Sequence, residues 1–191
     1  MKNLKICCDI DGVLAESLPT LLFIVNKNCG IKIKASEVTE FVFHRKYQIT
    51  DKQFQNCIEE FNTHYLQMLP TIVGARRVLY NLSSEHSKNI LTCRTNRGTT
   101  ETWLKTQCFF YKDLILCGTG EDKVDYCKIN KADLLIDDCG DTCLLANKAK
   151  IPSVLYNAPY NRYVEGEYIT RCKNWQQIAD HIKKVSEGTG I

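Results

Sequence analysis

The feature that most constrains the fold of this 191-residue chain is the alternation of short apolar, β-rich segments with segments of helical periodicity. The strand-like segments are 4–10, 88–93, 113–117, 132–137 and 151–156, and the helical patterns are 74–82, 99–108, 123–129, 141–148 and 175–185. Strands that alternate with helices form a parallel sheet that is covered on both faces. The sequence therefore predicts an α/β fold with a doubly wound parallel sheet.

One interval breaks this alternation. About sixty residues separate the first strand from the next core helix, and they contain two helical patterns of their own, 18–29 and 51–68. We therefore expect a small helical cap, residues 15–70, inserted directly after the first strand. The core is then formed by residues 1–14 and 71–191.

The composition excludes several classes of protein. A net charge of +3 is too small for attraction to a phosphate backbone to dominate, so nucleic acid is not the expected partner. The longest uncharged apolar run, 18–25, is far shorter than the roughly 20 residues of a membrane helix. The apolar N-terminal stretch contains Asp9 and Asp11, which a secretory signal would not carry. The 11 cysteines are odd in number and lie mostly in apolar segments, which favours reduced thiols in the cytoplasm.

Two carboxylates, Asp9 and Asp11, stand where the first strand opens into a loop, and Gly12 after them permits a sharp turn. Residues two apart on a strand face the same side, so both carboxylates can face one point beyond the strand end. Two like charges this close raise each other's pKa unless a cation lies between them. The alternative is that both residues only cap the loop and the following helix.

Other strand ends supply complementary groups at the edge where doubly wound sheets bind ligands. The second strand ends at Thr92, Cys93 and Arg94, whose hydroxyl and backbone N–H groups suit a phosphoryl oxygen. The fourth strand ends at a second acidic pair, Asp137 and Asp138. Two acidic pairs at two strand ends indicate a hard divalent cation such as Mg²⁺.

A lysine, Lys123, lies fourteen residues before Asp137 at the predicted start of a helix, where its charge can hold a charged intermediate. With it, four motifs occur in order along the chain: 9–13, Thr92, Lys123 and 137–138. In this order they resemble the motifs of the haloacid dehalogenase superfamily of phosphohydrolases, and the resemblance covers nearly the whole chain. It implies a Rossmann-like core and an enzyme that hydrolyses phosphomonoesters.

The resemblance also implies a role for each acidic residue. Asp9 is expected to attack phosphorus and become an aspartyl phosphate, while Asp11 protonates the leaving group and then activates water. Mg²⁺ is expected on the Asp9 carboxylate and the backbone carbonyl of Asp11. The remaining ligand is expected to be Asp138 with Asp137 behind it, or the reverse. Thr92 and the lysine complete the catalytic set, since positive charge offsets the repulsion between a carboxylate and a dianionic phosphate.

Within the superfamily, the early cap, the chain length and the stretch 132–138 resemble the 5′(3′)-deoxyribonucleotidases and their bacterial nucleotidase relatives. The stretch 159–162 resembles a Pro-aromatic-Asn loop of that group. The resemblance implies a nucleoside monophosphate as the small phosphorylated substrate. One departure is that 99–103 lacks the phosphate-binding lysine that the animal enzymes carry near a tryptophan. The third-motif lysine stays open between Lys123, which is favoured, and Lys128.

Substrate specificity is expected to come from the cap, because phosphate and metal occupy the core loops. The segment 41–47 is aromatic and basic, and Phe43 and Arg45 in it could stack on a base and pair with a phosphate or sugar. The alternative is that its aromatic side chains pack the cap and its charged ones lie on the surface. Asn161 and Arg162 are further candidates for substrate contact, together with the three residues that end the second strand.

Two other functions remain as alternatives. One is removal of a 3′-phosphate from a polynucleotide, which a shallow capped site could admit but the small net charge disfavours. The other is a non-catalytic nucleotide- or phosphate-binding protein, which would not need both Asp9 and Asp11. The sequence does not decide whether the chain forms a homodimer. The leading prediction is an Mg²⁺-dependent phosphomonoesterase.

Overall fold

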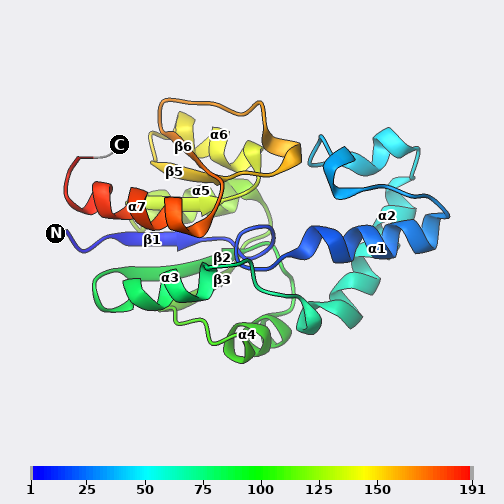
Figure 1. Cartoon of the computed structure of the whole chain (residues 1–191), viewed down its shortest axis with the longest axis horizontal. Helices are drawn as coiled ribbons and strands as arrows, with labels where there is room; N and C mark the ends of the chain where they lie inside the picture. Colours follow the sequence, from blue (N-terminus) through cyan, green and yellow to red (C-terminus); the bar gives the residue numbers. More distant parts are fainter. Residues whose placement is uncertain (1, 190–191) are drawn as a thin grey trace.

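The core of the molecule is a parallel sheet with the strand order β3-β2-β1-β4-β5-β6 (Figure 1). The computed structural model describes residues 2–189, apart from the side chain of residue 83. The strands are β1 (Lys5–Cys8), β2 (Ser87–Thr92), β3 (Asp113–Leu116), β4 (Leu134–Asp137), β5 (Ser153–Tyr156) and β6 (Ile169–Cys172). This is the predicted α/β fold with a doubly wound sheet.

Strand β1 lies in the middle of the sheet, between β2 and β4. Its last residue, Cys8, is in register with Ile90 of β2 and with Ile136 of β4. All three strands point the same way, so the loops that follow them meet at one edge. The polar residues predicted at these three strand ends are therefore neighbours in space.

Strand β6 is the one strand within residues 2–189 that the sequence pattern does not predict. It pairs with β5 at the edge of the sheet, with Thr170 opposite Val154. Its first three residues are only partly buried, and Thr170 and Arg171 interrupt any apolar run. An edge strand needs no continuous apolar pattern because one side of it is not covered by another strand.

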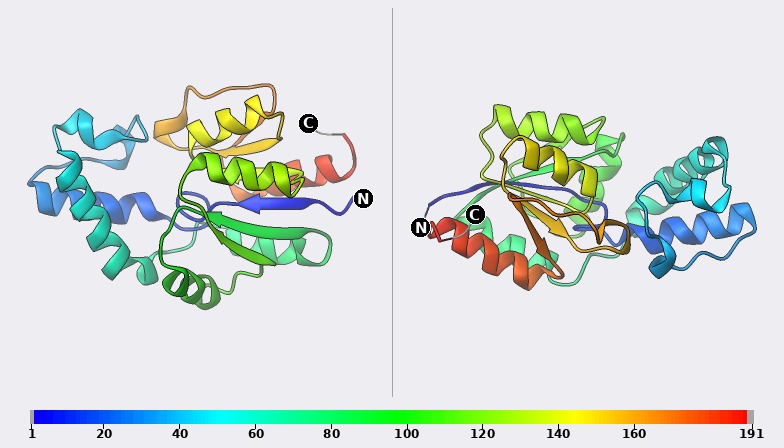
Figure 2. Two further views of the ribbon diagram at one scale, coloured as in Figure 1. Left: turned by 180° about the vertical axis from the view of Figure 1, so that it is seen from behind. Right: turned by 90° about the horizontal axis from the view of Figure 1, so that it is seen from above.

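Helices cover both faces of the sheet (Figure 2). They are α5 (Gly120–Ile129) and α6 (Gly140–Lys148) on one face, and α3 (Ala75–Asn81), α4 (Arg97–Thr106) and α7 (Trp175–Ser186) on the other. Within β1, Cys7 faces α5 and α6, whereas Ile6 and Cys8 belong to the core on the opposite face. Both faces are buried, which explains why the inner strands carry apolar runs such as Ile6–Cys8 and Leu134–Ile136.

Helix α5 begins three residues earlier than the sequence pattern predicts. The side chain of Thr119 accepts a hydrogen bond from the backbone N–H of Asp122, and the Asp122 carboxylate accepts one from the backbone N–H of Thr119. This reciprocal pair caps the helix and satisfies N–H groups that have no partner inside it. Lys123 therefore lies inside the first turns of α5 instead of at its start.

The chain between β1 and α3 forms a separate group of helices beyond the end of the sheet, which we call the cap (Figure 2). It contains α1 (Ser17–Cys29), η1 (Ala35–Glu37), η2 (Phe43–Tyr47), α2 (Asp51–Glu60), a π-helical turn (Phe61–Tyr65) and η4 (Leu66–Met68). The pattern 51–68 predicts one helix, and the structure divides it after Glu60. The residues Phe, Asn, Thr, His and Tyr that follow have low helix propensity, which explains the change.

Two buried tryptophans fix the two connections between the core and the cap. The indole N–H of Trp175 donates to the carbonyl of Val13, at 2.9 Å, on the outgoing connection. The indole N–H of Trp103 donates to the carbonyl of Leu69, at 3.0 Å, on the returning one. A buried indole N–H needs such a partner, so each tryptophan holds a defined point of the backbone.

Every cysteine is a free thiol, and most are buried. Among residues 2–189, no helix is both long enough and apolar enough to cross a membrane.

Candidate functional site

The loop after β1 carries Asp9 and turns sharply against the end of β4. The backbone N–H of Asp9 donates to the carbonyl of Ile136 at 2.9 Å, which continues the β1–β4 pairing by one residue. Gly12 has a φ of +75°, and a Cβ atom built there would lie 2.0 Å from Oδ2 of Asp138. Only glycine allows the loop to pass so close to this carboxylate.

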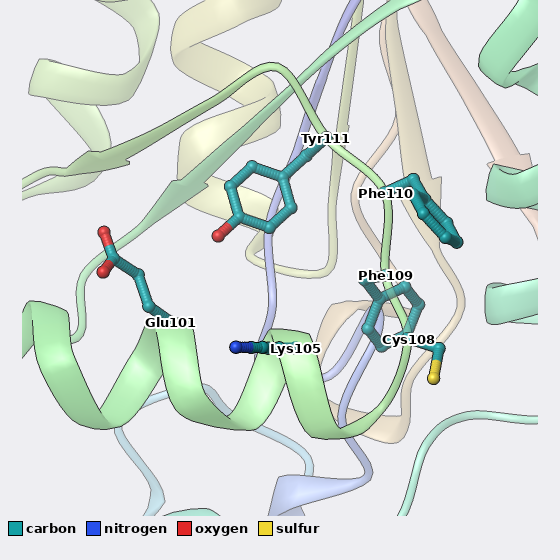
Figure 3. Close-up of a pocket in the computed structure, with 6 residues that line it drawn as sticks. All are labelled: Glu101, Lys105, Cys108, Phe109, Phe110 and Tyr111. Atoms are coloured by element: carbon teal, nitrogen blue, oxygen red, sulfur yellow. The ribbon is translucent and has the colours of Figure 1, made fainter.

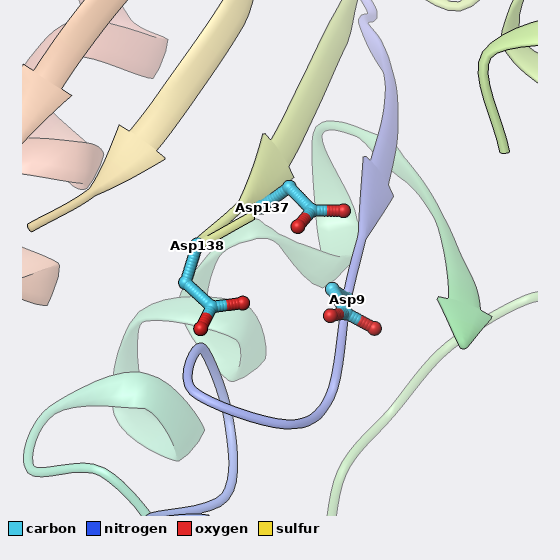
Figure 4. A group of neighbouring side chains, drawn as sticks. All are labelled: Asp9, Asp137 and Asp138. Atoms are coloured by element: carbon cyan, nitrogen blue, oxygen red, sulfur yellow. The ribbon is translucent and has the colours of Figure 1, made fainter. Parts of the chain in front are cut away.

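The strand ends bring three buried carboxylates together, and we call this group the acidic site (Figure 4). Oxygen atoms of Asp9, Asp137 and Asp138 lie within 4.8 Å of one another. Burial raises the pKa of Asp9 to about 7, against the lowering effect of Lys123. Burial also raises the pKa of Asp138 well above its ordinary value, and the charges of Asp137 and Asp9 add to the effect. Ionised carboxylates so close together need a positive charge.

Lys123 supplies one such charge. Its Nζ lies 3.0 Å from Oδ2 of Asp9 and 2.9 Å from Oδ2 of Asp137, and the residue is only 3% exposed. Burial lowers the pKa of Lys123, but Asp137 and Asp9 outweigh it and raise that pKa well above its ordinary value. Lys128, the alternative, is exposed and pairs with Asp125 at 3.1 Å. The geometry therefore assigns Lys123 to the acidic site.

The acidic site fits a divalent cation. Oδ1 of Asp9 is buried and has no hydrogen-bond partner among the described residues. Both oxygens of Asp137 are engaged, Oδ2 by Lys123 and Oδ1 by the backbone N–H of Cys139 at 2.8 Å. Three carboxylates against one lysine leave negative charge, and the donors are all oxygen, which Mg²⁺ prefers. Asp9 and Asp138 are thus better placed as ligands than Asp137.

Asp11 forms a second charged pair beside the acidic site. Arg94 donates to it through Nε at 2.8 Å and through Nη2 at 2.9 Å. The Arg94 side chain is buried, its guanidinium lies 5.1 Å from the ring centre of Trp103, and its Nη1 has no partner within residues 2–189. Such a two-point contact fixes the direction of a carboxylate. The sequence identifies Arg94 as a candidate for substrate contact but does not predict this pairing.

Thr92 and Cys93 lie at the carboxyl end of β2, as the sequence predicts. Thr92 is buried, and its hydroxyl oxygen accepts a hydrogen bond from the backbone N–H of Arg94 at 3.3 Å. Its own O–H can therefore donate to a ligand. Cys93 is exposed in the loop that follows.

Asn161 and Arg162 take positions that differ from the expected substrate contacts. Asn161 is buried in η6 (Pro159–Asn161), and its amide N–H groups donate to the carbonyls of Asp138 and Tyr156, both at 2.8 Å. Its side-chain oxygen accepts from Arg171 at 2.8 Å. All its polar atoms are used by the protein, so Asn161 supports the site and does not face a ligand. Arg162 is exposed and donates to its own loop, at the Pro159 carbonyl.

Tyr160 is a site residue that the sequence does not single out. Its hydroxyl donates to Oδ2 of Asp138, although the two residues are 22 positions apart. The only signal was its place within the stretch 159–162. A ring from the cap, Phe41, contacts the Tyr160 ring edge-on at 5.7 Å between centres.

The cap residues expected to contact substrate are engaged within the cap. Phe43 is buried and packs against Phe54, so its ring cannot stack on a base. Arg45 is exposed and pairs with Asp51 at 3.2 Å, and His44 contacts the same carboxylate at 2.8 Å. The hydrogen bonds from His44 and Arg45 hold the pKa of Asp51 below its usual value. The alternative interpretation of the segment 41–47, in which its aromatic side chains pack the cap and its charged ones lie on the surface, describes the structure better.

A hollow of about 470 Å³ lies elsewhere on the core, between α4 and the segment before β3 (Figure 3). It is lined by Glu101, Lys105, Cys108, Phe109, Phe110 and Tyr111. It shares no residue with the acidic site, so the cluster of charges and the hollow are separate features.

Known proteins resemble this chain in sequence and in fold. The family described as "5' nucleotidase, deoxy (Pyrimidine), cytosolic type C protein" matches residues 2–187. The Bacillus subtilis protein YqfW, which is assigned as a nucleotidase, is 27% identical over 175 residues. The match covers 90% of each chain. A nucleotidase of Clostridium acetobutylicum is 25% identical over 191 residues, 98% of this chain and 97% of its own.

Among solved structures, a haloacid dehalogenase-like hydrolase of Streptococcus pneumoniae superposes with a TM-score of 0.68 at 14% identity. The superposition covers 93% of this chain and 98% of the Streptococcus pneumoniae chain. A haloacid dehalogenase-like protein of unknown function from Agrobacterium tumefaciens gives 0.70 at 13% identity, over 96% of this chain and 99% of its own. At such identities the likeness concerns the fold.

Proposed function

Because the chain belongs to the family of cytosolic type C 5′-nucleotidases, we propose that it is a metal-dependent phosphomonoesterase that hydrolyses a nucleoside monophosphate through an aspartyl phosphate on Asp9. The family and the haloacid dehalogenase fold make it a phosphatase of the nucleotidase type. The finer proposal depends on one observation, the buried Asp9 held by Lys123 with its Oδ1 unpartnered. A cytosolic location agrees with the free cysteines and with the family's description.

We propose Mg²⁺ as the cofactor of the acidic site. Asp9 and Asp138 would hold it through their side chains and Asp11 through its backbone carbonyl, while Asp137 orients Lys123. When bound, Mg²⁺ supplies positive charge that reduces the repulsion between a carboxylate nucleophile and a dianionic phosphate.

The chain's own residues account for both halves of the reaction. A carboxylate oxygen of Asp9 forms a bond to phosphorus while the bond from phosphorus to the nucleoside oxygen breaks, and Asp11 gives its proton to that oxygen. A water molecule then attacks the phosphorus, Asp11 accepts a proton from it, and the bond to Asp9 breaks to release phosphate. Arg94 contacts both oxygens of Asp11 in the structure, and when one oxygen carries the proton the contact to the other oxygen still orients the group.

The phosphoryl group would be held by Lys123 and Thr92. Lys123 contacts Asp9, so its ammonium group lies close enough to stabilise negative charge on the phosphoryl oxygens. Thr92 can donate a hydrogen bond from its hydroxyl to one of these oxygens. Cys93 lies beside them in an exposed loop. The substrate class, a nucleoside monophosphate, comes from the family's description and from the nucleotidase relatives.

A hydrolysis panel tests the proposed function. Phosphate release is measured from ribo- and deoxyribonucleoside 5′- and 3′-monophosphates, from sugar phosphates and from an oligonucleotide 3′-phosphate, with Mg²⁺ or with EDTA. The proposal expects the mononucleotides to be preferred and EDTA to stop turnover. Turnover that is unaffected by EDTA contradicts the metal requirement, and a preference for the oligonucleotide would favour the polynucleotide 3′-phosphatase alternative instead.

A further inference from the structure

The short helix η6 contacts the acidic residue Asp138 at two points. The hydroxyl of Tyr160 donates to Oδ2 of the Asp138 side chain. The amide of the next residue, Asn161, donates to the Asp138 backbone carbonyl at 2.8 Å. One turn of chain thus holds both the main chain and the side chain of the same carboxylate.

This helix is itself rigidly attached to the sheet. Arg171 of β6 donates to the side-chain oxygen and to the carbonyl of Asn161, both at 2.8 Å, and to the carbonyl of Val164 at 2.8 Å. Charged donors that make several such bonds hold a loop in one conformation. Tyr160 is therefore presented to Asp138 from a fixed base.

The opposite side of Asp138 is closed by the loop after β1. A Cβ atom at Gly12 would lie 2.0 Å from Oδ2 of Asp138 and 3.1 Å from Oδ1, so the carboxylate has no room to swing toward that loop. With Oδ2 held by Tyr160, Oδ1 is the oxygen left to face a cation. Figure 4 shows the Asp138 side chain extending from the end of β4 toward Asp9.

The ring of Tyr160 makes a different contact from its hydroxyl. Phe41 of the cap meets it edge-on at 5.7 Å with 75° between the ring planes. Phe41 remains half-exposed, so this contact is not part of the apolar interior of the cap. The cap and core also meet here through η1 and η6.

We propose that Tyr160 is a positioning residue with two functions: its hydroxyl fixes Asp138 for the divalent cation, and its ring is the core surface on which Phe41 seats the cap. This inference rests on the proposed function, in which Asp138 holds the cation. A hydrogen bond that orients a ligating carboxylate typically improves metal affinity 10–100-fold. An edge-on aromatic pair contributes more modestly.

The first test separates the hydroxyl from the ring. Tyr160→Phe keeps the ring against Phe41 and removes only the donor. Tyr163→Phe is the matched control, because Tyr163 is 85% exposed and its ring lies near Arg162, which is not part of the acidic site. Mg²⁺ is titrated into metal-free protein by calorimetry. Tyr160→Phe is expected to raise the Kd about tenfold, with an unchanged melting temperature in EDTA and with kcat recovered at saturating Mg²⁺. Tyr163→Phe is expected to bind like the wild type.

The second test addresses the cap contact. Phe41→Ala keeps the Tyr160 hydroxyl. Val42→Ala is its matched control, since Val42 is the next residue, is also half-exposed and has no aromatic ring. Phe41→Ala is expected to leave the Mg²⁺ Kd unchanged, to speed tryptic cleavage of the cap in the Mg²⁺-loaded protein, and to raise KM more than it lowers kcat. Val42→Ala is expected to change none of these.

The outcomes distinguish a failure of this inference from a failure of the proposed function. If Tyr160→Phe binds Mg²⁺ as tightly as the wild type, or more tightly, the hydroxyl does not position Asp138, whatever the enzyme hydrolyses. If Phe41→Ala leaves both cap cleavage and KM unchanged, the contact between the Phe41 and Tyr160 rings does not hold the cap on the core. A wild type that binds no Mg²⁺ overturns the inference as well. A wild type that binds Mg²⁺ but hydrolyses no nucleotide overturns only the substrate.

Discussion

The acidic site of the core and the segment 41–47 of the cap both gather charged and aromatic side chains, and the two clusters differ in burial. In the core, Lys123 is 3% exposed and holds two carboxylates. In the cap, the side chains of Arg45 and Asp51 are 71% and 69% exposed. Water screens an exposed pair and leaves it with little energy, whereas buried charges depend on one another.

A charged cluster in this sequence thus forms a buried site only where the fold removes it from water. In the core, three strand ends and Gly12 exclude water from Asp9 and Asp138, which raises the pKa of both carboxyl groups. In the cap, the same residue types pack a small helical unit and face solvent.

Asp9→Asn is expected to lower kcat by at least about 10³-fold, because an amide cannot act as the nucleophile. The melting temperature of the metal-free protein should stay equal or rise, because the repulsion within the acidic site falls. Initial rates and thermal melts measure both effects. Asp141→Asn, at an exposed position of α6, is the control and should retain activity. Substantial turnover by Asp9→Asn would contradict the assignment of the nucleophile.

Lys123→Met is expected to destabilise the protein by about 3–5 kcal/mol, because Asp9 and Asp137 lose their buried counter-charge. Lys128→Met, on the exposed side of the same helix, should change stability by less than about 1 kcal/mol. Urea unfolding of both variants without Mg²⁺ gives the comparison. Equal effects at the two lysines would show that burial does not separate them.

Gly12→Ala and Gly30→Ala compare two glycines with positive φ, one in each region. At Gly12 a Cβ would collide with Asp138, whereas at Gly30, which ends α1 in the cap, it would meet nothing within 4 Å. Gly30→Ala should cost about 1 kcal/mol from backbone strain alone. Gly12→Ala should cost more than that and also weaken Mg²⁺ binding, as measured by unfolding and calorimetry. A Gly12→Ala protein with normal Mg²⁺ affinity would contradict the close approach.

Arg45→Ala is expected to have the smallest effect. Its partner Asp51 is exposed and also contacts His44, so kcat/KM should change less than about threefold. Steady-state kinetics on the best mononucleotide measures this. A KM raised tenfold or more with kcat unchanged would instead restore the sequence-based interpretation of Arg45 as a substrate contact.

The sequence predicts well those parts of the molecule whose cause is local. Strands β1 to β5 have apolar runs because both faces of the sheet are covered, and the residues that end β1, β2 and β4 follow directly from those runs. Strand β6 is not predicted, because its position at the edge of the sheet tolerates the polar residues Thr170 and Arg171. The end of α2 at Glu60 is not predicted, because low helix propensity alone does not interrupt the apolar helical pattern of the sequence.

The contacts that orient the site could not be predicted, because each joins residues far apart in sequence. Arg94 and Asp11 are 83 positions apart, and Tyr160 and Asp138 are 22 apart. Whether an arginine faces a substrate or a neighbouring carboxylate depends on where two loops end. The chemical groups of the site were therefore predictable, and their mutual orientation was not.

Chemical trapping of the covalent intermediate shows whether Asp9 is phosphorylated during turnover. The protein is mixed with its best nucleotide and Mg²⁺, quenched in acid and reduced with borohydride, which converts an aspartyl phosphate to homoserine; peptide mass spectrometry then locates the change. The account predicts homoserine at position 9, absent with EDTA and absent in Asp9→Asn. Rapid turnover with modification at another residue, or at none, would contradict it.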